Sequence, residues 1–149
     1  MRYILLTPLL MAALTGCSLL GQETLCTQAD ADSRVSAVWR PADFGGGDAA
    51  RIRLCVDGAC KERTSGGADD PFATVSVRLP DGIGASTVPV RLTITSARSG
   101  DMIVKDSVRA ELTEQHPNGT SCSPSAWTAT FRAHPEKGLI PPRGMKLQG

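Results

Sequence analysis

The sequence predicts an all-β domain, an antiparallel β-sandwich of about seven strands, over residues 34–134. Two observations predict it. Apolar and polar residues alternate along several short segments, and clusters of turn residues separate these segments every 8 to 15 residues. No stretch of this region suggests a helix of any length. Aromatic residues make up only 4% of the chain, so the core must be built mainly from aliphatic side chains.

The first sixteen residues have the layout of an export signal. Arg2 supplies the positive charge, and an apolar run of about 12 residues follows it, which is too short for a bilayer that needs about 20. Leu14-Thr15-Gly16-Cys17 then resembles the lipobox of bacterial lipoproteins. This resemblance implies that residues 1–16 are removed and that Cys17 receives a diacylglycerol.

An acylated Cys17 would place the mature protein at the cell membrane, lipid-anchored and facing the extracytoplasmic side. Two acyl chains give stable membrane anchoring where one is marginal. Residues 17–33 are small and polar with no sustained period, so we expect a tether that is tied to the domain at Cys26. At the other end, residues 135–149 lack any period and predict an extended tail.

The predicted strands are the segments 35–40, 51–56, 74–79, 88–95, 104–112 and 127–132, with one further strand after residue 58. Clusters of turn residues separate them, among them Pro41, Asp57-Gly58, Pro80-Asp81-Gly82 and Ser99-Gly100-Asp101. Asp106 interrupts the apolar face of the fifth segment, where we expect a bulge or a strand break to turn its carboxylate outward. The predicted inward-facing residues are Val35, Ala37, Trp39, Ile52, Leu54, Val56, Val75, Val77, Leu79, Val88, Val90, Leu92, Ile94, Val104, Val108, Ala110, Leu112, Trp127, Ala129 and Phe131.

A hairpin centred on Asp57-Gly58 predicts the first disulfide. Asp-Gly favours a two-residue type I′ turn, in which both central residues need a positive φ. With the turn there, Cys55 faces Cys60 as a non-hydrogen-bonded pair, whose Cα atoms lie about 4.5 Å apart and within reach of a disulfide. Cys55 shares its face with Arg51, so this bridge should lie on the solvent side.

The five cysteines suit an exported lipoprotein. Reserving Cys17 for lipid and pairing Cys55 with Cys60 leaves Cys26 and Cys122 for a second bridge, by elimination. The order Cys26, Trp39, Cys122 is similar to the Cys-Trp-Cys of immunoglobulin domains and favours an Ig-like topology. Cys122 lies in a turn cluster, however, and Thr120 stands where a tyrosine corner would have Tyr, which both disfavour a true immunoglobulin domain.

The whole chain resembles small lipoproteins of high-GC Gram-positive bacteria. The residues that carry this resemblance are the lipobox, the hairpin 54–60, and the turn 117–119 that leads into Cys122-Ser123-Pro124. Of these, only the lipobox is specific. The resemblance implies no catalytic motif.

The chemistry-bearing residues predict no enzyme, no cofactor and no metal site. His116 and His134 lie beside turns, and the four remaining cysteines are assigned to bridges, which leaves no thiol nucleophile and no soft metal ligand. The acidic pairs lack the ligand spacing of an EF-hand loop. The leading hypothesis is a non-enzymatic binding or structural module; the alternative is a cell-wall-associated hydrolase or a hydrolase inhibitor that uses the loops 43–48 and 64–71.

The net charge of the chain limits the classes of partner that it could bind. The chain has 16 basic and 15 acidic residues, and Arg2 is the only charged residue before Cys17, so the mature protein is formally neutral. This disfavours a nucleic-acid partner. Outward-facing arginines could form an anion-binding face for a cell-wall polymer or an acidic envelope protein, or could be balanced by neighbouring acids. The candidates are Arg51, Arg53, Arg78 and Arg91, with Arg109 and Arg132.

Overall fold

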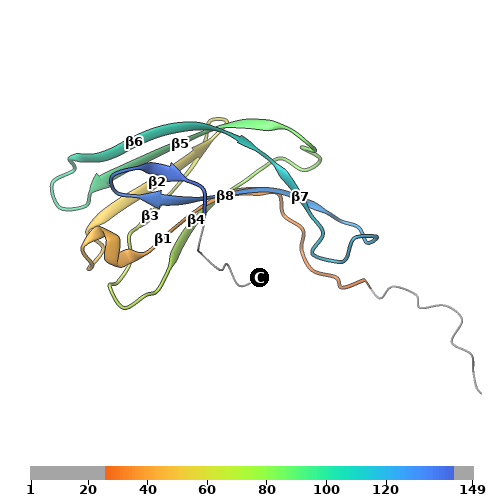
Figure 1. Ribbon diagram of the computed structural model, residues 1–149, viewed down its shortest axis with the longest axis horizontal. Helices are drawn as coiled ribbons and strands as arrows, with labels where there is room; N and C mark the ends of the chain where they lie inside the picture. Colours follow the sequence, from red (N-terminus) through yellow and green to blue (C-terminus); the bar gives the residue numbers. More distant parts are fainter. Residues whose placement is uncertain (1–25, 143–149) are drawn as a thin grey trace, which may run out of the picture.

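The protein folds as an all-β sandwich (Figure 1). The computed structural model describes residues 26–142. Within this range the only helical element is a short 3₁₀ turn, η1 (Pro41–Phe44), and no helix is long and apolar enough to cross a membrane. The strands are β1 (Arg34–Trp39), β2 (Ala50–Val56), β3 (Ala59–Thr64), β4 (Ala73–Arg78), β5 (Thr87–Ser96), β6 (Met102–Glu111), β7 (Thr113–Gln115), β8 (Ala126–His134) and β9 (Gly138–Ile140).

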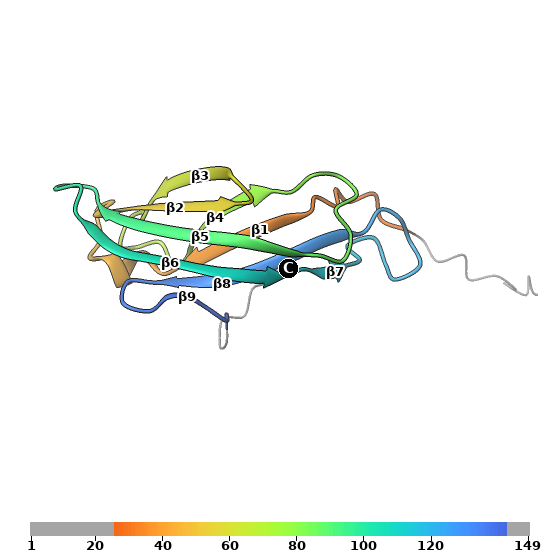
Figure 2. The same ribbon diagram turned by 90° about the horizontal axis from the view of Figure 1, so that it is seen from above.

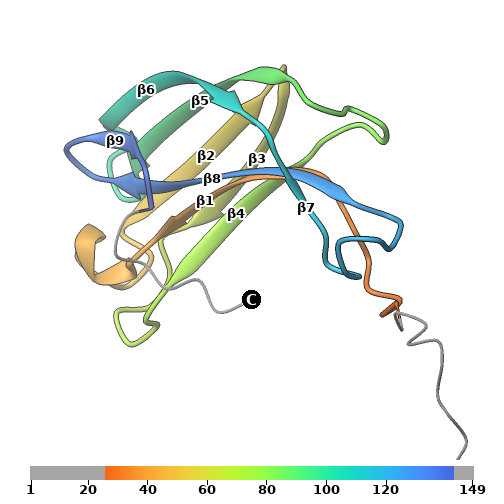
Figure 3. The same cartoon turned by 45° about the vertical axis from the view of Figure 1, so that its right-hand side comes forward.

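Two sheets pack against each other, as Figure 2 shows from above. The first sheet has the order β4-β1-β8, with β7 and β9 pairing to β8 at different positions; the second sheet has the order β3-β2-β5-β6. All pairings are antiparallel except that of β1 with β8, which is parallel. Only Leu112 separates β6 from β7, so the chain passes from the second sheet to the first there (Figure 3).

The predicted inward-facing residues are confirmed, because each belongs to the core cluster or packs partly buried against it. Val35, Ala37 and Trp39 of β1 are fully buried and face Ile52 and Leu54 of the other sheet within one cluster. Trp127 and its alternating neighbours on β8 are partly buried against the same cluster. The core therefore rests on aliphatic side chains, as the low aromatic content predicts.

The Asp57-Gly58 turn has the predicted form. Asp57 has φ 47° and Gly58 has φ 88°, and Cys55 is the cross-strand partner of Cys60. The two cysteines form a disulfide with a Cα–Cα distance of 4.0 Å. Cys60 is exposed, so this bridge lies on the solvent side as predicted.

The prediction that a bulge or a strand break turns the Asp106 carboxylate outward is wrong. β6 runs without a break through this residue, which pairs with the buried Leu92, and the bulge of this ladder lies instead beside Thr95. The carboxylate points inward because β9 covers it: the backbone N–H of Leu139 donates to Asp106 Oδ2 at 2.8 Å. Gly138, with φ 72°, fits beside it because a Cβ there would overlap the Asp106 side chain.

The segment after Pro135 is also more ordered than predicted. Residues 138–140 form β9, an antiparallel partner of β8 in which Ile140 lies opposite Arg132. Leu139 is buried against the core. A strand of three residues is too short to show a period of two, so the sequence alone predicts an extended tail here. Residues 143–149 of the predicted tail lie outside the described range.

Candidate functional site

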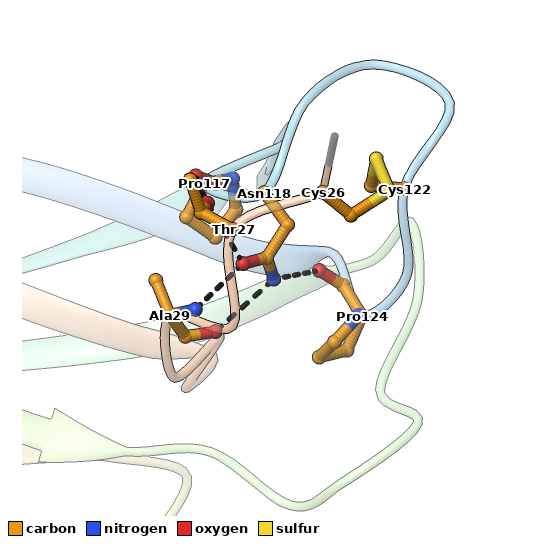
Figure 4. The surroundings of a disulfide bond; sticks show 7 residues. All are labelled: Cys26, Thr27, Ala29, Pro117, Asn118, Cys122 and Pro124. Atoms are coloured by element: carbon orange, nitrogen blue, oxygen red, sulfur yellow. Dashed lines mark hydrogen bonds between the residues drawn. A yellow bond between two sulfur atoms is a disulfide. The ribbon is translucent and has the colours of Figure 1, made fainter. Parts of the chain in front are cut away.

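One end of the sandwich is fastened by the second predicted disulfide. Cys26 and Cys122 are bonded across a sequence separation of 96, with a Cα–Cα distance of 5.7 Å (Figure 4). This bridge joins the segment before β1 to the β7–β8 loop, residues 116–125. It does not connect the two sheets through the core, which is the role of the disulfide in an immunoglobulin domain.

Asn118 reinforces this junction with four hydrogen bonds. Its Oδ1 accepts from Ala29 N at 2.7 Å and from Thr27 Oγ1 at 3.2 Å, while its Nδ2 donates to Ala29 O at 3.0 Å and Pro124 O at 3.3 Å. Figure 4 shows the amide held between the two segments. Asn118 is only 3% exposed. A side chain that is buried with all its donors and acceptors used is a structural centre of this loop.

The second half of the predicted tether, residues 26–33, is bound to the domain by these contacts. The segment 26–33 is bound to the domain by the disulfide, by Asn118 and by Ser33, whose Oγ accepts a 2.9 Å hydrogen bond from Trp127 N. Residues 26–33 are therefore held against the domain. The remainder of the predicted tether, with the predicted acylation site Cys17, lies outside the described residues.

Asn118→Ala is expected to destabilise this junction by about 1–3 kcal/mol, because it removes the hydrogen bonds of a buried side chain, two of them to the backbone of Ala29. Hydrogen exchange should show faster exchange at Ala29 N, and urea denaturation should give the loss of stability. Ser123→Ala is a suitable control in the same loop, since its side chain forms no hydrogen bond within the described residues. Unchanged exchange at Ala29 in the Asn118 variant would contradict this role.

The same junction builds a groove that the sequence did not predict. A hollow of about 680 Å³ lies on the outer face of the first sheet. Its floor is polar, with Ser36 and Ser76 joined by a 2.8 Å hydrogen bond between their hydroxyls. Residues 30–32 and 115–117 line its rim. No local pattern could reveal it, because the rim depends on the docking of residues 26–33 against a loop 90 residues away.

The two histidines lie at opposite ends of β8. His116 lines the groove, and its Nε2 is 3.8 Å from Glu114 Oε2, longer than a hydrogen bond. Glu114 instead accepts a 2.7 Å hydrogen bond from Ser125 Oγ. A Ser-His-acid relay needs the histidine between the other two groups, so these three residues do not form one. Nδ1 of His134 accepts backbone N–H groups of the following turn at 3.1 and 3.3 Å.

The structure places the four arginines of the predicted anion-binding face on two different sheets. Arg51, Arg53 and Arg91 lie on the outer face of the second sheet, because β2 and β5 pair with Cys55 opposite Arg91. All three are exposed. Arg78 lies on β4 of the first sheet and is bound to Asp32 at 3.0 Å and to Asp81 at 3.5 Å. Arg78 is therefore not part of the predicted face.

Of the two additional arginines, one joins this face and one does not. Arg109 lies opposite Pro89 in the β5–β6 ladder, on the outer side of the second sheet, with Lys105 on the same side of β6. Arg132 lies on the first sheet and forms a 2.9 Å ion pair with Asp43 of η1. We call the outer side chains Arg51, Arg53, Arg91, Lys105 and Arg109 the basic face.

Comparison with known proteins adds no assignment to this geometry. No family model, curated protein or solved structure is significantly similar to the chain. Among residues 26–142, His, Cys, Asp and Glu side chains form no group of three that could hold a metal ion. The basic face and the groove are the two candidate binding surfaces that the described part of the chain offers.

Proposed function

We propose that this chain is a bacterial lipoprotein, anchored by lipid at Cys17 on the extracytoplasmic side of the cell membrane, and that its sandwich is a non-enzymatic binding module. The lipobox-like Leu14-Thr15-Gly16-Cys17 carries this proposal. The two disulfides support the compartment, since such bridges persist in oxidising environments.

The position of Cys26 supports the anchoring geometry. Cys26 follows Cys17 by nine positions in the sequence, and nine extended residues reach about 30 Å at most. The Cys26–Cys122 bridge thus fixes the point at which a membrane tether would enter the domain. That point lies at the end of the sandwich that carries the β7–β8 loop.

The acylation is tested with a Cys17→Ala variant of the full chain, produced in a bacterium that processes lipoproteins. The natural chain should partition into the detergent phase, and mass spectrometry should show a diacylated Cys17 as its first residue. The variant should stay in the aqueous phase or keep its signal sequence, because the thiol that forms the thioether is lost. Ser18→Ala is the matched control and should behave like the natural chain. A natural chain that carries no diacylglycerol on Cys17 in the mass spectrum would reject the anchor.

The alternative, a wall-associated hydrolase or a hydrolase inhibitor, gains no supporting contact in the described residues. Its loops 43–48 and 64–71 meet at one end of the sandwich, where the Gly66 N–H donates to Asp48 Oδ1 at 2.9 Å. His116 is at the other end, beside the β7–β8 loop. A binding module is the function that this arrangement favours.

A further inference from the structure

The basic face has more positive than negative charge, and its charges are not neutralised by contacts. Its five basic side chains are accompanied on the same face by two acids, Glu62 and Glu111. No member of the basic face forms an ion pair within residues 26–142, although Glu62 is the cross-strand neighbour of Arg53. The two other arginines of the predicted set, Arg78 and Arg132, are both ion-paired. Free cations are thus concentrated on the second sheet.

A recess gives this face a local binding geometry. A hollow of about 270 Å³ lies over the β5–β6 ladder, lined by Arg91, Ser107 and Arg109. Ser107 is directly opposite Arg91 in the ladder, and Arg109 is the next outer residue of β6. One Arg109 N–H group lies 3.5 Å from Thr87 O, which leaves its other donors free. Two guanidinium groups and a hydroxyl around one hollow match the acceptor oxygens of a phosphate group.

The remaining arginines extend the recess into a row. Arg51 and Arg53 follow each other on the outer side of β2, and residues two apart in a strand are separated by about 6.8 Å. Arg91 lies on the adjacent strand, opposite Cys55, which is the next outer residue of β2. Positive groups therefore follow one another along β2 and across to β5 and β6. A ligand that uses all of them must carry several anionic groups in sequence.

We infer that the basic face binds an anionic phosphodiester polymer of the cell envelope, with one phosphate between Arg91 and Arg109 and further phosphates at Arg51 and Arg53. This inference rests on the proposed function, because such a polymer meets the domain only outside the cytoplasm. Arginine is suited to the role since its guanidinium binds phosphate with two parallel N–H groups.

The position of the tether favours a polymer over lipid headgroups. Residues 30–32 line the groove on the outer side of the first sheet, whereas the basic face is the outer side of the second sheet. Figure 3 shows the start of the described chain on the far side of the sandwich from β5 and β6. A tether that enters at that point does not cover the basic face, which leaves this face open to a polymer.

The test measures binding of a synthetic poly(glycerol phosphate) to the full chain in neutral detergent. Working in detergent makes the result independent of acylation, so failure of this inference and failure of the lipid anchor are distinguishable. Arg91→Gln with Arg109→Gln should weaken binding about tenfold, which corresponds to two exposed charge contacts. The same pair changed to Glu should abolish binding. Affinity should fall steeply with added salt.

Two arginines outside the face provide matched controls. Arg98→Gln removes a free, exposed arginine in the β5–β6 turn, and Arg78→Gln removes an ion-paired one; both should bind as the natural chain does. Circular dichroism should show that every variant is folded. An unchanged affinity for the Arg91/Arg109 double variant would overturn the inference, as would an equal loss for Arg98→Gln.

Two further arms decide the source of the phosphate. The full chain is offered duplex DNA, and it is offered phosphatidylglycerol-containing vesicles beside pure phosphatidylcholine vesicles. Binding to the polymer that exceeds binding to both supports an envelope polymer. Tighter binding to DNA than to the polymer would overturn the inference. Tighter binding to the anionic vesicles than to the polymer would also overturn it, if the Arg91/Arg109 double variant loses that vesicle binding.

Discussion

Replacing Cys26 and Cys122 together by serine is expected to lower the free energy of unfolding by about 4–5 kcal/mol. The disulfide closes a loop of 96 residues, and in the chain-entropy model the stabilisation grows with the length of the closed loop. Guanidinium denaturation followed by far-UV circular dichroism measures this change. Such a loss is a large part of the total stability of an ordinary domain, so the variant should be close to unfolding at 37 °C.

The hairpin disulfide is the matched control. Cys55→Ser with Cys60→Ser opens a loop of only five residues, for which the same model gives about 2 kcal/mol. The two double variants should therefore differ by more than 2 kcal/mol. Equal losses from the two bridges would show that loop length does not govern their contributions in this protein.

Trp39→Ala is expected to cost about 3–5 kcal/mol, the usual range for removing a large aromatic side chain from a core. Trp39 is fully buried, and its indole Nε1 donates to the carbonyl of Ser65 at 2.8 Å. Ser65 is also fully buried and its Oγ accepts from Ala50 N at 3.1 Å. The substitution thus leaves a cavity and leaves the carbonyl of Ser65, just after β3, without its donor. Thermal unfolding by differential scanning calorimetry measures the loss.

Phenylalanine variants separate the two parts of this effect. Trp39→Phe keeps most of the ring and removes the hydrogen bond, so it should cost clearly less than Trp39→Ala but still leave Ser65 O without its donor. Trp127→Phe changes the other tryptophan, which is only partly buried, and should cost less again. A Trp127→Phe loss as large as that of Trp39→Phe would refute the special role of the Trp39–Ser65 contact.

The sequence predicts the parts of this fold that depend on local periods. Alternation along Val35 to Trp39 and along Ile52 to Val56 identifies the buried face, because a strand turns each successive side chain to the opposite side. The Asp57-Gly58 turn also fixes the register and thus the Cys55–Cys60 bridge. Both inferences need only neighbouring residues and simple geometry.

The parts that were missed depend on contacts between distant segments. Asp106 was expected to turn outward because an acid on an apolar face is costly, but β9 supplies it with the backbone N–H of Leu139. Residues 26–33 look like a tether until Asn118 binds Ala29. Similarly, the separation of Arg78 from the basic face follows from strand order, which no single strand reveals.

The Cys26–Cys122 bridge also determines which strands would bear a pulling force on the domain. Tension applied through a membrane tether enters at Cys26, and the disulfide shares it between the chain leading to β1 and the chain leading to β8. These two strands are parallel neighbours in the middle of the first sheet, and both begin at the tethered end. Pulling would therefore act on two central strands together and would not peel away one strand at an edge.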